Sequence, residues 1–129
     1  MEVYKILDED NRLLAFEIDC NLISIGKMVE LLRADPIITD IRKRQLFSAE
    51  EELRLAFNIN GVPFIIAEPF GDNSRFWVGP LGNLNADNEH LVKKIEKHFL
   101  DYQPPILRRI LGKILRGGTA RKSRKWNSG

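Results

Sequence analysis

The sequence predicts an α+β domain: a mainly antiparallel sheet of about five strands, in the order β-β-α-β-β-β-α, with its helices on one face and an additional amphipathic helix at the C-terminus. Two observations predict this class. Short runs of alternating apolar residues are separated by tight-turn residues, which is typical of hairpins. Two other segments repeat apolar residues every three or four positions, which is typical of helices packed on a sheet.

The first two strands are expected at residues 2–8 and 13–18. The polar run from Asp8 to Arg12 is rich in turn formers, so these strands should form a hairpin. The apolar positions expected to share a face are Tyr4 and Ile6 in the first strand, and Leu14, Phe16 and Ile18 in the second.

A helix should follow, with Ser24 as its N-cap and its end before Pro36. Helical spacing places four apolar residues on its inner face: Ile25, Met28, Val29 and Leu32. The second helix should begin at a cap formed by Asp87 or Asn88 and run to about Asp101. Its expected inner face consists of Leu91, Val92, Ile95 and Phe99, and its wet face of Lys93, Lys94 and Lys97.

The middle of the chain predicts strands at 37–43, 52–59, 62–68 and 75–78. Residues 48–51 resemble a helix capping box, but the strict alternation after them favours a strand. That alternation involves Leu53, Leu55, Phe57 and Ile59. Asn60 and Gly61 predict a type I′ hairpin, and a second tight turn is expected around Gly71, Asp72 and Asn73.

Charge divides the chain into two parts. Residues 1–103 hold 12 of the 20 Lys and Arg residues and all 18 acids, a net charge of −6. Residues 104–129 contain no acid and carry +8, from Arg108, Arg109, Lys113, Arg116, Arg121, Lys122, Arg124 and Lys125. The sequence therefore predicts an acidic α+β domain followed by a basic segment.

The basic segment begins with a predicted amphipathic helix after Pro104 and Pro105, and its last residues are expected to be disordered in isolation. Its apolar face consists of Ile106, Leu107, Ile110, Leu111, Ile114 and Leu115. This face could pack on the acidic domain or on a second copy, forming a homo-oligomer. Alternatively, the basic residues could bind an anionic membrane, nucleic acid or a protein partner.

Composition excludes several classes of protein. A hydrophobic content of 43% is typical of a globular chain, and a single cysteine allows no internal disulfide. No secretion signal or membrane-spanning run is visible. The expected location is the cytoplasm, with peripheral membrane attachment as the alternative.

The sequence indicates no catalytic residue, metal site or cofactor. Cys20 lies between Asp19 and Asn21 without a nucleophile signature, so a packed or incidental thiol is the simpler interpretation. His90 and His98 are eight residues apart and lack companion ligands, which favours surface histidines.

One hairpin tip is rich in functional side chains: Glu68, Asp72, Asn73, Arg75 and Trp77. Turn chemistry and an Arg75–Glu68 pair across the hairpin would explain most of them. The functional alternative is a protein-recognition site anchored by Arg75 and Trp77. Glu68 and Asp72 could also form an acid–base pair.

The block from Glu68 to Pro80, EPFGDNSRFWVGP, resembles one found in a family of small bacterial proteins without an established function. Those proteins also begin with a hairpin that contains a run similar to Ala15–Ile18, AFEI. The resemblance covers roughly residues 1–80 and implies a bacterial source, but neither an activity nor catalytic residues.

The leading hypothesis is a non-enzymatic protein-interaction module, such as an immunity-protein-like inhibitor of a bacterial toxin or effector. An acidic domain suits a basic partner, because opposite charges steer association. Two alternatives remain open: an adaptor attached to membrane or nucleic acid by its basic helix, and a small hydrolase or transferase using Glu68, Asp72 and Arg75.

Overall fold

A computed structural model describes residues 1–43, 51–69 and 74–105 of the chain. Its elements, in order, are β1 (Tyr4–Leu7), β2 (Leu13–Asp19), α1 (Ile25–Arg33), β3 (Ile38–Lys43), β4 (Glu51–Ile59), β5 (Val62–Pro69), β6 (Arg75–Pro80), a 3-10 turn (Ala86–Asn88) and α2 (Glu89–Asp101). The α+β class is confirmed. All four strands expected between the helices are present, so the sheet has six strands where the summary order β-β-α-β-β-β-α gives five.

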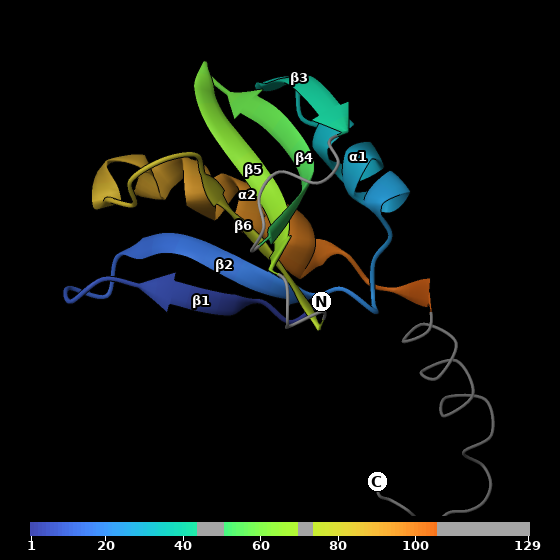
Figure 1. Cartoon of the computed structure of the whole chain (residues 1–129), viewed down its shortest axis with the longest axis horizontal. Helices are drawn as coiled ribbons and strands as arrows, with labels where there is room; N and C mark the ends of the chain where they lie inside the picture. The colour runs from blue at the N-terminus through green and yellow to red at the C-terminus, as the bar shows by residue number, and fades with distance from the viewer. Residues whose placement is uncertain (44–50, 70–73, 106–129) are drawn as a thin grey trace, which may run out of the picture.

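The strands form one sheet in the order β1-β2-β6-β5-β4-β3, and every neighbouring pair is antiparallel. After the β1–β2 hairpin, α1 carries the chain to the far edge of the sheet (Figure 1). The strands β3 to β6 then return until β6 pairs with β2. This non-local pairing joins the N-terminal hairpin, through β2, to the last strand, β6.

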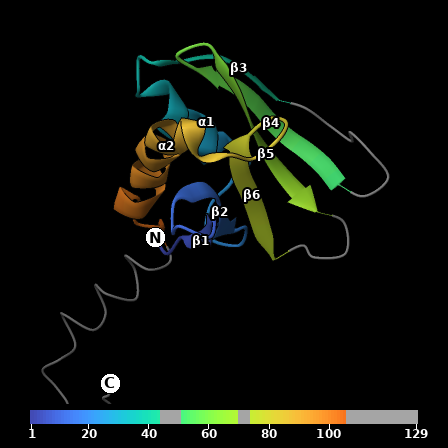
Figure 2. The same cartoon turned by 90° about the vertical axis from the view of Figure 1, so that its left-hand side faces the viewer.

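Both helices lie on the same side of the sheet (Figure 2). Their inner faces join side chains from β2, β4, β5 and β6 in the main core. The predicted inner faces are confirmed: Met28, Val29, Leu32, Leu91, Val92, Ile95 and Phe99 are buried, and Ile25 packs against them. At about 25 cal/mol per Å² of buried apolar surface, this core supplies the main stabilisation of the fold.

The helix caps agree with the sequence at one helix and differ at the other. The backbone N–H of Lys27 donates to Ser24 Oγ at 3.1 Å, which confirms the N-cap of α1. Asn88 occupies the cap position of α2 but makes no side-chain cap bond. Asn85 instead caps the preceding 3-10 turn, accepting from Asp87 N at 2.8 Å. The polar cap therefore lies one turn earlier than predicted.

Two turns form as their residues predict. Asn60 and Gly61 have φ values of 49° and 83°, as a type I′ hairpin requires. In the β1–β2 turn, Asp8 Oδ1 accepts from the backbone N–H groups of Asp10 and Arg12, both at 2.9 Å. The Asp8 carboxylate thus holds the turn closed, and these backbone bonds lower its pKa.

Bulges overturn two of the predicted alternations. Leu53 pairs with Ala67 and Leu55 with Ile66, so the register shifts at the intervening residue. Leu53 consequently faces away from the helices, whereas Leu55, Phe57 and Ile59 join the main core. A similar shift in β2 makes Leu13, rather than Leu14, the core residue. When one strand contains an extra residue, the side chains beyond that residue point to the opposite face of the sheet from the one that simple alternation predicts.

The predicted C-terminal amphipathic helix and the turn at residues 71–73 lie outside the described residues. Within the parts that are described, no helix is long and apolar enough to cross a bilayer.

Candidate functional site

A row of paired residues crosses the sheet on the face opposite the helices. Tyr4 pairs with Glu17, Glu17 with Trp77, and Trp77 with Ala67. Directly paired residues point to the same side of a sheet. The next residue along β2, Phe16, points into the helix-covered core, so this row must face the other way. We call this side of the sheet, centred on Trp77, the open face.

Trp77 packs over a cluster of small and aliphatic residues on the open face. A second apolar cluster there consists of Leu53, Ala56, Ile65 and Ala67, and the half-buried indole packs against it. A Cβ placed on Gly79 would lie 2.7 Å from Trp77 Cη2 and 2.8 Å from the Ala15 side chain. The indole therefore lies along its own strand over Gly79, where only a glycine leaves room.

Two residues before Trp77 on the same strand, Arg75 is held between an aromatic ring and a carboxylate. Its guanidinium carbon lies 3.6 Å from the centroid of the Tyr4 ring, and Nη1 donates to Glu17 Oε1 at 3.3 Å. Arg75 also pairs in register with Asp19. Stacking fixes the plane of the guanidinium while leaving its edge accessible, and its side chain is 40% exposed.

The predicted pair between Arg75 and Glu68 is wrong. Ala67 and Trp77 share the open face, so Glu68, one residue further, points to the helix side. There Glu68 Oε1 lies 3.9 Å from Arg54 Nε. Because the two residues point to opposite faces, the structure does not bring Glu68 and Arg75 into one catalytic site.

The remaining predicted site residues lie outside the described part of the chain. These are Asp72 and Asn73 of the hairpin tip and the eight basic residues of the C-terminal segment. Of the five hairpin-tip residues, the structure therefore places Arg75 and Trp77 together and Glu68 apart from them.

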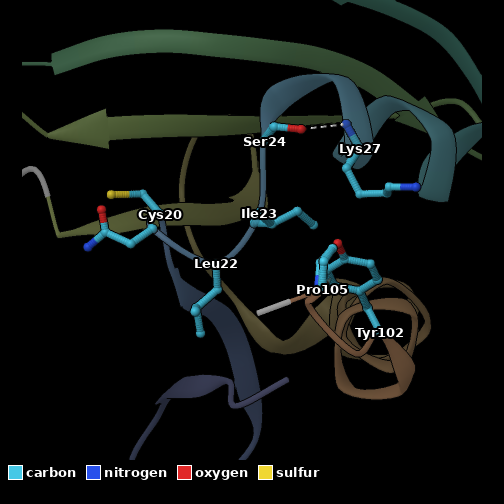
Figure 3. Close-up of a pocket in the computed structure, with 8 residues that line it drawn as sticks. Cys20, Leu22, Ile23, Ser24, Lys27, Tyr102 and Pro105 are labelled. Carbon is cyan, nitrogen blue, oxygen red and sulfur yellow. Dashed lines mark hydrogen bonds between the residues drawn. The ribbon is translucent and has the colours of Figure 1, made fainter. Parts of the chain in front are cut away.

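Cys20 borders an open depression of about 390 Å³ between the segment 20–24 and the end of α2 (Figure 3). Its thiol points away from Tyr102 and Pro105 on the opposite wall. The residues lining the depression include no histidine or carboxylate that could act as a base for the thiol.

The two histidines have different environments. His90 is exposed, as expected for a surface histidine, whereas His98 is partly buried and lies 2.9 Å from Asp35 Oδ2. This bond links α2 to the segment between α1 and β3, and it lowers the pKa of Asp35. In the described part of the chain, no three His, Cys, Asp or Glu side chains are grouped so that they could hold a metal ion.

Among the residues that the structure describes, one charged residue is buried. Glu96 of α2 is 5% exposed and contacts the Lys5 ammonium on β1. The pair links the edge strand β1 to α2. A buried carboxylate with a cationic partner of this kind is structural, since removing either residue would leave the other unpaired.

Comparison with known proteins provides no family or function for this chain, so the candidate site is argued from the structure alone. No protein-family model, curated protein or solved structure matches this chain.

Sequence reasoning missed three residues of the open face: Tyr4, Glu17 and Asp19. Glu17 interrupts the apolar run of β2, a signal that it points away from the core. The contact between Glu17 and Arg75 could not be predicted in the same way, because β2 pairs with β6, a strand almost sixty residues later in the chain. Trp77 and Arg75 were found by residue type, since both are typical anchors of protein interfaces.

Proposed function

We propose that this protein is a protein-interaction module that binds its partner through the open face of its sheet. The observation that carries the proposal is the arrangement of Trp77, Arg75 and Tyr4 beside Glu17. Tryptophan, tyrosine and arginine are the residue types that dominate binding energy at interfaces. Here they are partly exposed and held in place by the sheet, so little conformational entropy is lost on binding.

The charge of the open face indicates the chemistry of the partner. Glu2, Glu17 and Asp19 lie around the Tyr4–Arg75 stack, where Arg75 is the only cation among these residues. Tyr4 Oη donates to Glu2 Oε1 at 3.4 Å, which extends the acidic border to the end of the sheet. Residues 1–103 carry −6 in total. A basic protein would be steered to this surface by both the local and the overall charge.

An immunity-protein-like inhibitor of a basic toxin or effector is the specific form of this proposal. Such an inhibitor needs a rigid, acidic surface and no catalysis of its own. It would act by covering the cationic site of the toxin.

The test is affinity capture at low salt with the full chain, after nuclease treatment. Trp77→Ala removes the central indole, and Leu100→Ala truncates an exposed apolar residue on α2 as the matched control. We expect one stoichiometric basic protein to be retained by the wild type and by Leu100→Ala, and lost with Trp77→Ala. Equal retention by all three proteins, or no retained protein, would reject the proposal.

The inhibitor role needs a second readout. The captured protein should arrest growth when it is expressed alone and be tolerated when this chain is co-expressed. If growth is the same with and without this chain, the inhibitor role is rejected while the binding role stands.

A further inference from the structure

We propose that the basic C-terminal segment of the same chain, residues 106–125, binds the open face in cis and competes with the external partner. The competition rests on the proposed function, whereas binding of the segment to the open face does not require an external partner. It assigns an intramolecular role to the separation of charge along the chain.

The place where the described chain ends supports this occupant. Pro105 borders the same depression as Cys20 and Asn21, and these residues directly follow Asp19 at the end of β2. Figure 3 shows Pro105 across the depression from the segment that leaves β2. The basic segment therefore starts at the end of the sheet that carries Asp19, Arg75 and Tyr4.

The length of the segment is sufficient. Arg108 is three residues beyond Pro105 and can extend up to roughly 10 Å from it, at about 3.3 Å per residue. Lys125 is twenty residues beyond and can reach up to roughly 66 Å by the same measure. The longer reach exceeds the width of a domain of about 100 residues, whose radius of gyration is about 13 Å, so the later basic residues of the segment can reach the open face.

The basic segment and the open face are complementary in charge and in side-chain chemistry. The segment carries eight cations and no acid. On the open face, Glu2 and Glu17 lie next to Tyr4, and Asp19 pairs in register with Arg75. A lysine or arginine can stack on the Trp77 indole while its charge is paired by Glu17 or Asp19. The aliphatic residues of the segment can cover Ile6 and Trp77, which are only partly buried.

Tethering makes even a weak contact effective. Segments joined by a short linker face each other at an effective concentration in the millimolar range. An intrinsic Kd of about 1 mM would therefore occupy the open face about half of the time. An external partner would have to displace the segment, so its apparent affinity would rise when the segment is neutralised.

The two tryptophans provide the test, because Trp77 lies on the open face and Trp126 lies beside the basic segment. The full chain is labelled with 5-fluorotryptophan, and the two fluorine signals are assigned with Trp77→Phe and Trp126→Phe. Replacing the eight basic residues of the segment with glutamine should shift the Trp77 signal. Raising NaCl to 1 M, where the screening length is about 3 Å, should move it in the same direction.

The matched control replaces Lys93, Lys94 and Lys97 on the exposed side of α2 with glutamine. This variant should leave the Trp77 signal unchanged. A Trp77 signal that is identical with the native and the neutralised segment would overturn the inference. A shift that disappears on dilution would also overturn it, because the segment would then bind a second copy. Neither result would affect the partner-capture experiment, so the two proposals fail separately.

Discussion

The two faces of the sheet are built by the same strands but in different ways. The helix-covered face is filled with large side chains, including Phe16, Phe57 and Phe64, which are at most 1% exposed. The opposite face has alanines and a glycine beneath one tryptophan, with a charged cluster beside it. The helix-covered face therefore holds most of the buried core, whereas the opposite face also displays anchors and charges that stability does not require.

This difference predicts that substitutions on the two faces will have opposite consequences. Changes on the helix side should cost folding free energy and leave any binding by the folded fraction intact. Changes to exposed groups on the open face should cost binding and little stability. The predictions below test this contrast in order of decreasing effect on stability.

Phe57→Ala should have the largest effect. Phe57 is fully buried and stacks on Phe64 with ring centroids 5.8 Å apart. Truncating a buried phenylalanine costs about 3–5 kcal/mol, a large part of the stability of a small domain. Urea denaturation followed by circular dichroism would measure it. A loss below about 1 kcal/mol would show that the helix-covered face does not hold the fold together.

Gly79→Ala should cost about 1–3 kcal/mol, because the new methyl would overlap the Trp77 indole and the Ala15 side chain. Tryptophan fluorescence should change in the folded state as the indole moves. Gly26→Ala is the control: it lies in α1, where the added methyl meets only Ser24 Oγ at 4.0 Å. It should stabilise the protein by about 0.5–1 kcal/mol, since alanine favours helix. The reverse order would contradict the placement of Trp77 over Gly79.

Asp35→Asn should cost up to about 1 kcal/mol near neutral pH, the usual net contribution of an intramolecular hydrogen bond. The hydrogen bond with His98 is the main cause of the lowered pKa of Asp35. A carboxyl with a lowered folded pKa stabilises the fold above its unfolded pKa of about 3.9 and loses this contribution as pH falls through the folded value. Denaturation curves of the wild type and the variant should therefore converge below that range. A constant difference between pH 7 and pH 2.5 would contradict this assignment.

Glu17→Gln should have the smallest effect on stability, about 0.5 kcal/mol, because its ion pair with Arg75 is partly exposed. Thermal denaturation would measure the change. The control, Glu30→Gln, removes a carboxylate that pairs with Lys27 at 2.9 Å on α1. The two variants should unfold within a few degrees of each other. A loss of several kcal/mol for Glu17→Gln alone would make this residue a structural element rather than a recognition element.

The fold could be predicted from the sequence where it depends on local interactions. Hairpin turns such as Asn60 and Gly61, and caps such as Ser24, act over a few residues, so their residue types identify them. Strand order could not be predicted, because the pairing of β2 with β6 depends on packing across the whole sheet. Bulges were missed for the same reason: the extra residue between Leu53 and Leu55 is visible only when the partner strand is known.

The candidate site divides in a similar way. Arg75 and Trp77 could be selected by their chemistry, but their neighbours could not. The sequence suggested Glu68 as the partner of Arg75 because both flank one turn, whereas the alternation of β5 places them on opposite faces. Glu17 takes that role from a strand near the N-terminus. Face assignment, rather than proximity in sequence, determines which charges meet.

The central claim is that the partner recognises the open face itself, and is not attracted only by the net negative charge of residues 1–103. A titration of the captured partner with Glu17→Lys and Glu30→Lys tests it most directly, because both variants change the net charge equally but lie on different sides of the molecule. We predict that Glu17→Lys weakens binding at least roughly 30-fold, the effect of a central interface residue worth about 2 kcal/mol. Glu30→Lys should weaken it less than about threefold, through reduced steering alone. Equal losses of affinity for the two variants would contradict the claim.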